Sequence, residues 1–209
     1  MTPLSHLDVR APSPEDVKAT WRSTVRRNRA DRSERRLAEH GLSFRDHLLS
    51  LPEVAGATCV SVYLSRRHEP ATMPFIEELH ARGVRVLVPL LGDGLQRGWG
   101  EFTSAADAVE RAPGRPPEPS SEFLPQEELR HADAVIVPAL AADTSGTRLG
   151  QGGGWYDRAL ADARPDAPII ALVFADEFHD ATQRPIPRED HDLPVSIVVT
   201  PAAVHRVGA

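Results

Sequence analysis

The chain has 209 residues, 41% of them hydrophobic, which is enough for one domain with a sizeable core. A formal net charge of −6 argues against a nucleic-acid partner, and the single cysteine, Cys59, excludes an internal disulfide or a cage of several cysteines around a metal. The longest apolar runs fall short of the roughly 20 residues that a membrane-spanning helix needs, so we expect a cytoplasmic protein without a membrane partner.

The first 12 residues lack hydrophobic periodicity, and we expect a mobile arm before a single α/β domain over 13–209. A helix should begin after Ser13, which can cap it, and Pro14 suits the first helical position. Apolar residues then recur at every fourth position and predict the buried face of this helix: Val17, Trp21 and Val25.

Cations repeat the same spacing one position further along this helix, at Lys18, Arg22 and Arg26. They should line the edge of the packed face, or form a solvated basic surface with exposed side chains. Lys18 is the only lysine among 24 basic residues, so its compact ammonium is either specifically required or a chance survivor.

A second helix is expected from Ser33 to about Leu51, although Gly41 could interrupt it. The next stretches alternate between strand and helix patterns: strand 57–64, helix 72–83 and strand 84–91. Residues 92–126 are irregular, with a possible short strand near 99–102, and their Pro-rich part at 112–125 could cover a site.

Later elements continue the alternation: strand 133–141, helix 155–163, strand 168–175 and strand 194–200. Strands that are apolar on both faces and separated by helices predict an α/β fold, a three-layer sandwich with a mostly parallel central sheet flanked by helices. Such a Rossmann-like fold, with a topology like that of sugar-phosphate isomerases, collects ligands beyond the carboxyl ends of its strands.

The stretch "RLGQGGGWYDRAL" at 148–160 lies between a strand and a helix, where that rule places a ligand. Glycines allow backbone amides to approach an anion, the following helix adds its positive end, and Arg148 and Arg158 add charge. The spacing matches neither the Walker A loop nor the dinucleotide fingerprint. The pattern favours a phosphate site, and a strained turn is the alternative.

With its flanks, "GTRLGQGGGWYDRAL" resembles the signature of 5-formyltetrahydrofolate cyclo-ligases, also called 5,10-methenyltetrahydrofolate synthetases. Three further segments resemble that family in order: the Lys18 and Arg22 pair, "VYLSRRHEPAT" at 62–72, and "REDHDLPVSIVVTP" at 188–201. Gln151 and Trp155 replace usual tyrosines, Ser196 replaces a common Asp, and "ADEFHDA" departs from a Phe-x-x-Gln pattern.

The resemblance implies an enzyme that uses ATP and Mg²⁺ to convert 5-formyltetrahydrofolate into 5,10-methenyltetrahydrofolate through a phosphorylated formyl (iminophosphate) intermediate, releasing ADP and phosphate. It implies that Lys18, Arg148 and Arg158 act on the phosphates. The implied nucleotide contacts are Lys18, Arg22, Arg148, Leu149, Gly150, Gln151, Gly152, Gly153, Gly154, Trp155 and Tyr156. The implied folate contacts are Leu64, Glu69, Gly150, Gln151, Gly152, Gly154 and Trp155. The implied Mg²⁺ ligands are Asp157 and Asp192.

Simpler interpretations stay open for the acidic residues. Asp157 could pair with a neighbouring arginine, Glu189 or Asp190 could replace Asp192 at the metal, and Glu69 could cap the next helix. The whole chain could also be a non-catalytic folate- or nucleotide-binding protein of the same fold, or an enzyme like the sugar-phosphate isomerases. We expect a monomer whose partners are 5-formyltetrahydrofolate and ATP.

Overall fold

The computed structural model describes residues 13–111, 115–189 and 192–208. The predicted arm at 1–12 and part of the Pro-rich segment, residues 112–114, lie outside this range. Within it, no helix has both the length and the apolar character needed to cross a membrane.

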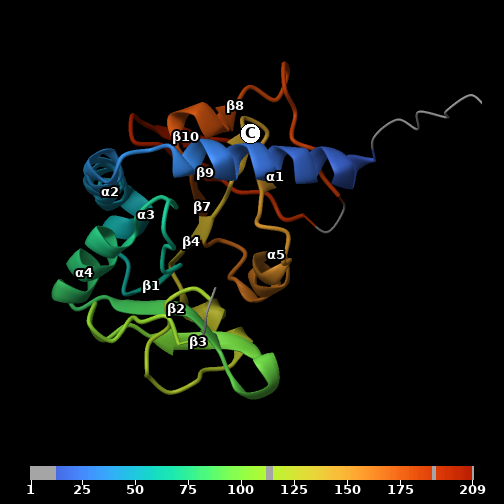
Figure 1. The fold of residues 1–209 in the computed structure, drawn as a ribbon. Coiled ribbons are helices and arrows are strands. Elements are labelled where there is room, and N and C mark those ends of the chain that lie inside the picture. The colour runs from blue at the N-terminus through green and yellow to red at the C-terminus, as the bar shows by residue number, and fades with distance from the viewer. Residues whose placement is uncertain (1–12, 112–114, 190–191, 209) are drawn as a thin grey trace, which may run out of the picture.

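A seven-stranded sheet in the order β10-β9-β7-β4-β1-β2-β3 forms the centre of the fold (Figure 1). Its strands are β1 (Cys59–Val62), β2 (Arg85–Leu91), β3 (Arg97–Glu101), β4 (Ala134–Pro138), β7 (Ile169–Leu172), β9 (Ile197–Val199) and β10 (Val204–Arg206). The five inner strands are parallel, whereas the edge strands β3 and β10 run antiparallel to their neighbours. The predicted mostly parallel α/β sheet is confirmed.

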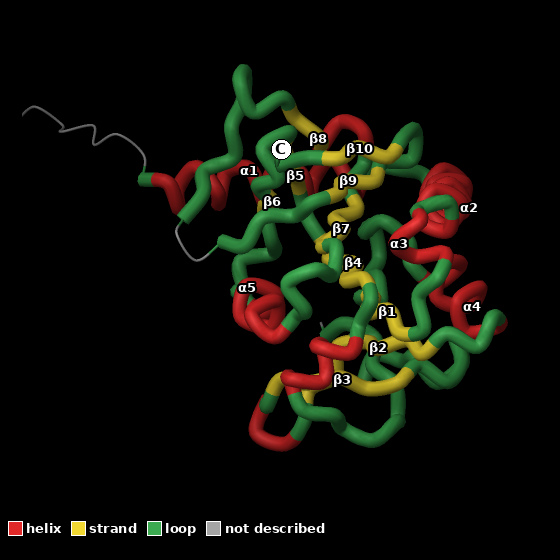
Figure 2. The backbone as a smooth tube through the Cα atoms, turned by 180° about the vertical axis from the view of Figure 1, so that it is seen from behind, coloured by secondary structure: helices red, strands yellow, loops and turns green. Residues whose placement is uncertain are grey.

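Helices flank this sheet, with α2 (Glu34–Leu49), α3 (Pro52–Ala55) and α4 (Met73–Ala81) together on one side and α5 (Trp155–Ala159) on the other (Figures 1 and 2). Gly41 does not interrupt α2. It is a point of close approach, since a Cβ there would be 3.1 Å from the Ala71 Cβ. Short 3₁₀ turns cover 93–95, 126–131, 160–162 and 175–177.

The first helix, α1 (Pro14–Ala30), begins with the predicted cap. The Ser13 hydroxyl accepts from the Asp16 amide at 3.2 Å, and the Asp16 carboxylate accepts from the Ser13 amide at 2.8 Å. Its buried face differs from the prediction, because Lys18 and Arg29 are buried along with Val25. Val17 and Trp21 are only half-buried. The face is polar because α1 buries these two cations against carboxylates of distant segments, Lys18 against Glu189 and Asp192, and Arg29 against Glu177.

Several predicted elements were longer than those observed, and two of these differences bear on the site. The strand expected over 133–141 is β4 alone, after which the chain enters a second, three-stranded sheet of β5 (Ala141–Asp143), β6 (Arg148–Leu149) and β8 (Phe178–His179). The helix expected over 155–163 ends as an α-helix at Ala159. Strand β6 ends directly before the glycine run at 150–154, so the small sheet holds the start of this run, and α5 begins at its other end.

Candidate functional site

A cavity of about 590 Å³ opens at the carboxyl ends of β1, β2 and β4, where ligands of such sheets collect. Its walls include Tyr63 and Leu64 after β1, Leu90 and Leu91 at the end of β2, and Pro138 at the end of β4. Other segments complete the walls with Glu15, Lys18, Arg22, Arg66, Glu69, Pro89, Pro116, Pro117, Glu118, Arg148 to Asp157, Glu189 and Asp192.

The glycine-rich turn at 150–154 forms one wall of this cavity. Gly152 and Gly154 have φ values of +99° and +59°, which favour glycine. Arginines hold three of its carbonyls: Arg22 Nε donates to Gly150 O at 3.1 Å, Arg26 Nη2 to Gln151 O at 3.0 Å and Arg158 Nη2 to Gly153 O at 3.0 Å.

The main-chain amides of this turn differ from its carbonyls in their hydrogen bonding. None of the amides from 150 to 154 donates to an acceptor in the part of the chain that the structure describes. Unpaired amides beside the first turn of a helix are suited to binding an anion.

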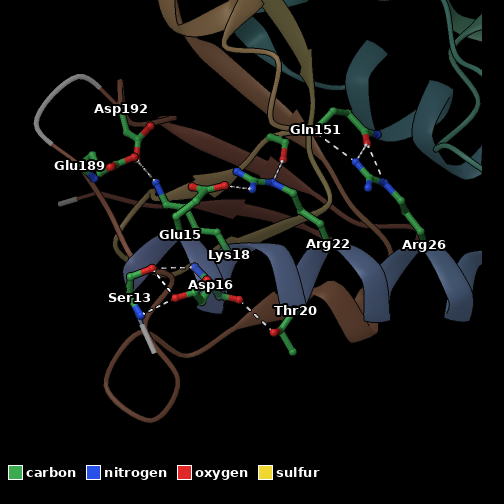
Figure 3. Close-up of polar contacts among 11 residues, drawn as sticks. Ser13, Glu15, Asp16, Lys18, Thr20, Arg22, Arg26, Gln151, Glu189 and Asp192 are labelled. Atoms are coloured by element: carbon green, nitrogen blue, oxygen red, sulfur yellow. Dashed lines mark hydrogen bonds and ion pairs between the residues drawn. The ribbon is translucent and has the colours of Figure 1, made fainter. Parts of the chain in front are cut away.

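The α1 helix brings its cations to this turn across more than a hundred residues of sequence (Figure 3). Arg22 contacts the Gly150 carbonyl and also pairs with Glu15 at 2.6 Å, while Arg26 reaches Gln151. Lys18 and Arg22 line the cavity, so the predicted meeting of the first helix with the glycine-rich turn is observed.

Lys18 differs from an exposed cation, because only 5% of it is accessible. Its Nζ is 2.9 Å from both Glu189 Oε2 and Asp192 Oδ2 (Figure 3). Burial alone would lower the pKa of Lys18, but the hydrogen bonds and charges of the two carboxylates outweigh it and raise the pKa. This pairing ties α1 to the segment before β9.

Arg148 and Asp157 form an ion pair in the cavity wall. Arg148 is buried, and its Nε has no hydrogen-bond partner within the described chain. The buried Tyr156 hydroxyl has none there either, and burial raises the pKa of Tyr156. Buried polar atoms without a partner cost folding free energy, so this wall carries a local energetic cost in the structure.

The wall after β1 contains the residues expected to contact folate. Leu64 is buried, and the Tyr63 hydroxyl fixes the loop by donating to Pro70 O at 2.8 Å. The Glu69 carboxylate accepts from Gln151 Nε2 at 2.8 Å and from the Arg66 amide at 2.9 Å. Glu69 thus links this wall to the glycine-rich turn and does not cap α4, which begins four residues later.

The two carboxylates predicted to bind metal both line the cavity, but each faces a cation. Asp157 pairs with Arg148, and Asp192 pairs with Lys18. Across the described ranges, no group of three or more His, Cys, Asp or Glu side chains is arranged to hold a metal ion. The two carboxylates can supply part of the coordination shell of a Mg²⁺ ion, with a ligand's phosphates supplying the rest. They do not form a metal site made of protein ligands alone. Asp190 lies outside the described residues.

Arg158 is the exception among the predicted site residues. It is exposed, it is not part of the cavity wall, and its guanidinium braces the turn through Gly153 O. A direct role on phosphate is therefore not supported by its position. Sequence reasoning also missed Glu15, which α1 brings to the cavity, and Arg66 and Glu118, although the carboxyl-end rule points to the ends of β1 and β2 near which the last two lie.

Comparison with known proteins identifies the family. Residues 14–201 match the model of the 5-formyltetrahydrofolate cyclo-ligase family. A 5-formyltetrahydrofolate cyclo-ligase of Mycolicibacterium smegmatis is 38% identical over 159 residues, covering 73% of this chain and 78% of that protein. One from Escherichia coli is 31% identical over 182 residues, covering 86% and 98%.

Two solved structures of synthetases resemble this chain in fold. The 5,10-methenyltetrahydrofolate synthetase of Aquifex aeolicus superposes with a TM-score of 0.76 at 25% identity, covering 92% of this chain and 94% of that one. The synthetase of Mycoplasma pneumoniae shares the fold, with a TM-score of 0.66 at 15% identity over 87% and 97% of the two chains. The chain therefore belongs to the 5-formyltetrahydrofolate cyclo-ligase family.

Proposed function

We propose that this protein is an ATP-dependent 5-formyltetrahydrofolate cyclo-ligase that releases 5,10-methenyltetrahydrofolate, ADP and phosphate. One observation carries the assignment of the site: a turn with unpaired amides meets the cations of α1 in a cavity that also has an apolar wall. Family membership favours this activity over an isomerase-like one.

The proposed reaction has two steps. The formyl oxygen attacks the γ-phosphorus of ATP, ADP leaves, and the formyl group becomes a phosphorylated imine. N10 then adds to the formyl carbon and loses its proton, and the C–O bond breaks. Inorganic phosphate departs with the former formyl oxygen, and the methenyl bridge between N5 and N10 remains.

Both steps depend on positioning and on charge neutralisation more than on a protein nucleophile. The amides of 150–154 would receive the phosphates, and Lys18, Arg22 and Arg148 would surround them with positive charge. Lys18 would then exchange part of its contact with Glu189 and Asp192 for phosphate oxygens. Arg158 would act indirectly, by holding the turn.

The apolar wall would bind the reduced pterin and the ring attached to N10. Leu64, Leu90 and Leu91 provide flat apolar surface, and Trp155 is supported by Trp99 in an edge-to-face contact with centroids 4.9 Å apart. Water excluded by this wall would otherwise hydrolyse the phosphorylated intermediate.

When bound, Mg²⁺ would neutralise phosphate charge. Asp157 and Asp192 would supply its protein oxygens, directly or through water. Because both carboxylates already accept from Arg148 and Lys18, the metal would enter with the nucleotide.

A titration with 5-formyltetrahydrofolate, ATP and Mg²⁺, followed by the absorbance of the methenyl product, tests the proposal. We expect the product only when all three are present. Binding of folate without any absorbance change would instead favour a non-catalytic folate-binding protein. Binding of a phosphorylated sugar that is indifferent to nucleotide and to Mg²⁺ would favour an isomerase-like enzyme.

A further inference from the structure

Glu118 is a buried acid in the cavity wall that the mechanism above does not use. Only 5% of the residue is accessible, and it lines the cavity with Pro116 and Pro117. Its Oε1 accepts one long hydrogen bond, from the Leu91 amide at 3.3 Å. No cation of the described chain lies within 4 Å of its carboxylate.

The other carboxylates of the wall are better satisfied. Glu15 pairs with Arg22, Asp157 with Arg148, and Glu189 and Asp192 share Lys18. Glu69 has no cation within 4 Å among the described residues, but amide donors engage both of its oxygens. Glu118 is therefore the wall carboxylate with the largest unused capacity to accept hydrogen bonds.

The backbone holds Glu118 firmly in this place. Its amide donates to Val109 O at 2.9 Å, and the Val109 amide donates back at 3.2 Å. The following residues pack onto glycines of β3: a Cβ on Gly98 would be 2.2 Å from Leu124 O, and one on Gly100 would be 2.7 Å from Ser121 Oγ. This close approach fixes the carboxylate against the β2–β3 hairpin.

A buried carboxylate that accepts only one long hydrogen bond leaves acceptor capacity unsatisfied, which costs folding free energy. The cost is offset when a ligand supplies donors, and two adjacent N–H groups suit the two oxygens of a carboxylate. Reduced pterins present such a pair, the 2-amino group and the neighbouring ring N3–H. Adenine presents its amino group beside a ring nitrogen that accepts, which would repel the second oxygen.

We propose that Glu118 recognises the reduced pterin by accepting hydrogen bonds from its 2-amino and N3–H groups, and so determines specificity for folate. The inference rests on the proposed function, because it assumes that the cavity takes a folate. Glu69, which also lines the cavity, joins this wall to the glycine-rich turn through Gln151.

The test compares Glu118→Gln with Glu122→Gln, an exposed neighbour outside the cavity wall. Glutamine keeps the shape but turns one acceptor into a donor. We expect the KM for 5-formyltetrahydrofolate to rise about tenfold or more in E118Q, with the KM for ATP within about twofold. E122Q should match the parent protein. The thermal midpoint of E118Q should not fall, because no ion pair is lost.

A second measurement does not depend on turnover. Quenching of tryptophan fluorescence gives the affinity for 5-formyltetrahydrofolate and for an analogue with methyl in place of the 2-amino group. The parent protein should bind the analogue about tenfold or more weakly, whereas E118Q should scarcely distinguish the two. Glu118→Asp keeps the carboxylate but moves it back from the cavity by one methylene group. This variant should also bind 5-formyltetrahydrofolate more weakly.

The outcomes separate the two claims. The assignment of Glu118 would be overturned if E118Q bound 5-formyltetrahydrofolate as tightly as the parent protein and still distinguished it from the 2-methyl analogue. A rise confined to the KM for ATP would overturn it as well. Absence of methenyl product with the parent protein, with the expected discrimination retained, would overturn the cyclo-ligase activity and leave pterin recognition standing.

Discussion

At the scale of single residues, Lys18 combines a structural and a functional position. It is buried between Glu189 and Asp192, yet it lines the cavity beside Arg22. The absence of every other lysine fits a site that requires a compact ammonium, since three donors on one nitrogen can serve two carboxylates and a phosphate together.

Replacing Lys18 with Met should therefore impair both function and stability. We expect a much higher ATP requirement and a loss of about 1–2 kcal/mol in the free energy of unfolding, less than for a fully buried pair because Glu189 is half exposed. Denaturation in urea together with ATP-dependent kinetics checks both effects. An unchanged midpoint of unfolding would mean that the pairing contributes nothing to the fold.

The pH dependence of this effect follows from the pKa of Lys18, which is raised above its ordinary value of 10.5. A raised pKa means that the pairing stabilises the fold below pH 10.5 and is lost as the pH rises through the folded pKa. The difference in unfolding free energy between the parent and K18M should therefore shrink above pH 10.5.

At the scale of elements, a buried ion pair anchors α1 over the site. Arg29 Nε and Nη2 donate to the two oxygens of Glu177 at 2.9 and 2.7 Å, and Nη2 also donates to Ala139 O at 2.7 Å. Both side chains are almost fully buried. Because α1 is a continuous helix, this anchor in its last turn fixes the position of Lys18 and Arg22, which lie nearer its N-terminus.

Removing one partner should be costly. We expect Arg29→Met to destabilise the fold by about 3–5 kcal/mol, because it leaves the Glu177 charge buried without its main partner. Removing both charges, in R29M with Glu177→Leu, should cost less than the single change. Urea denaturation measures this, with exposed Arg27→Met as the matched control. A double variant with a lower free energy of unfolding than R29M would contradict the explanation.

The glycine-rich turn allows a sharper test at Gly153, where a Cβ would meet no atom within 4 Å and φ is not positive. Gly153→Ala should leave the thermal midpoint nearly unchanged but weaken ATP binding, because the methyl group occupies space that a phosphate needs. Calorimetric titration with ATP measures the change. Gly56→Ala, equally open and remote from the cavity wall, is the control. Full ATP affinity in G153A would show that the turn only redirects the chain.

At the scale of the whole molecule, the site joins segments from both ends of the chain, so ligands should stabilise the entire fold. With ATP and Mg²⁺ at about 100 times the dissociation constant, we expect roughly 2.7 kcal/mol of added stability. Mg²⁺ alone should leave the thermal midpoint unchanged, because Asp157 and Asp192 already face cations. A rise with Mg²⁺ alone would reveal a preformed metal site.

Much of the architecture was predictable because it depends on neighbouring residues. The Ser13 cap, the apolar strands and the glycine run each carry a local signal, and all appear close to the expected positions. The boundaries after β4 and α5 were less predictable, because pairing in the small sheet and packing of a short helix depend on distant segments.

The amino-acid sequence alone determined the α/β class and the place of the glycine-rich turn, because hydrophobic periodicity and backbone freedom are properties of adjacent residues. The family followed from the resemblance of its ordered motifs. Only the tertiary structure decided which charges meet. It paired Lys18 with carboxylates more than 170 positions away, placed Arg158 outside the cavity, and left Glu118 in the wall with no cation of the described residues within 4 Å. Side-chain partners are set by packing between distant elements, and no local pattern records them.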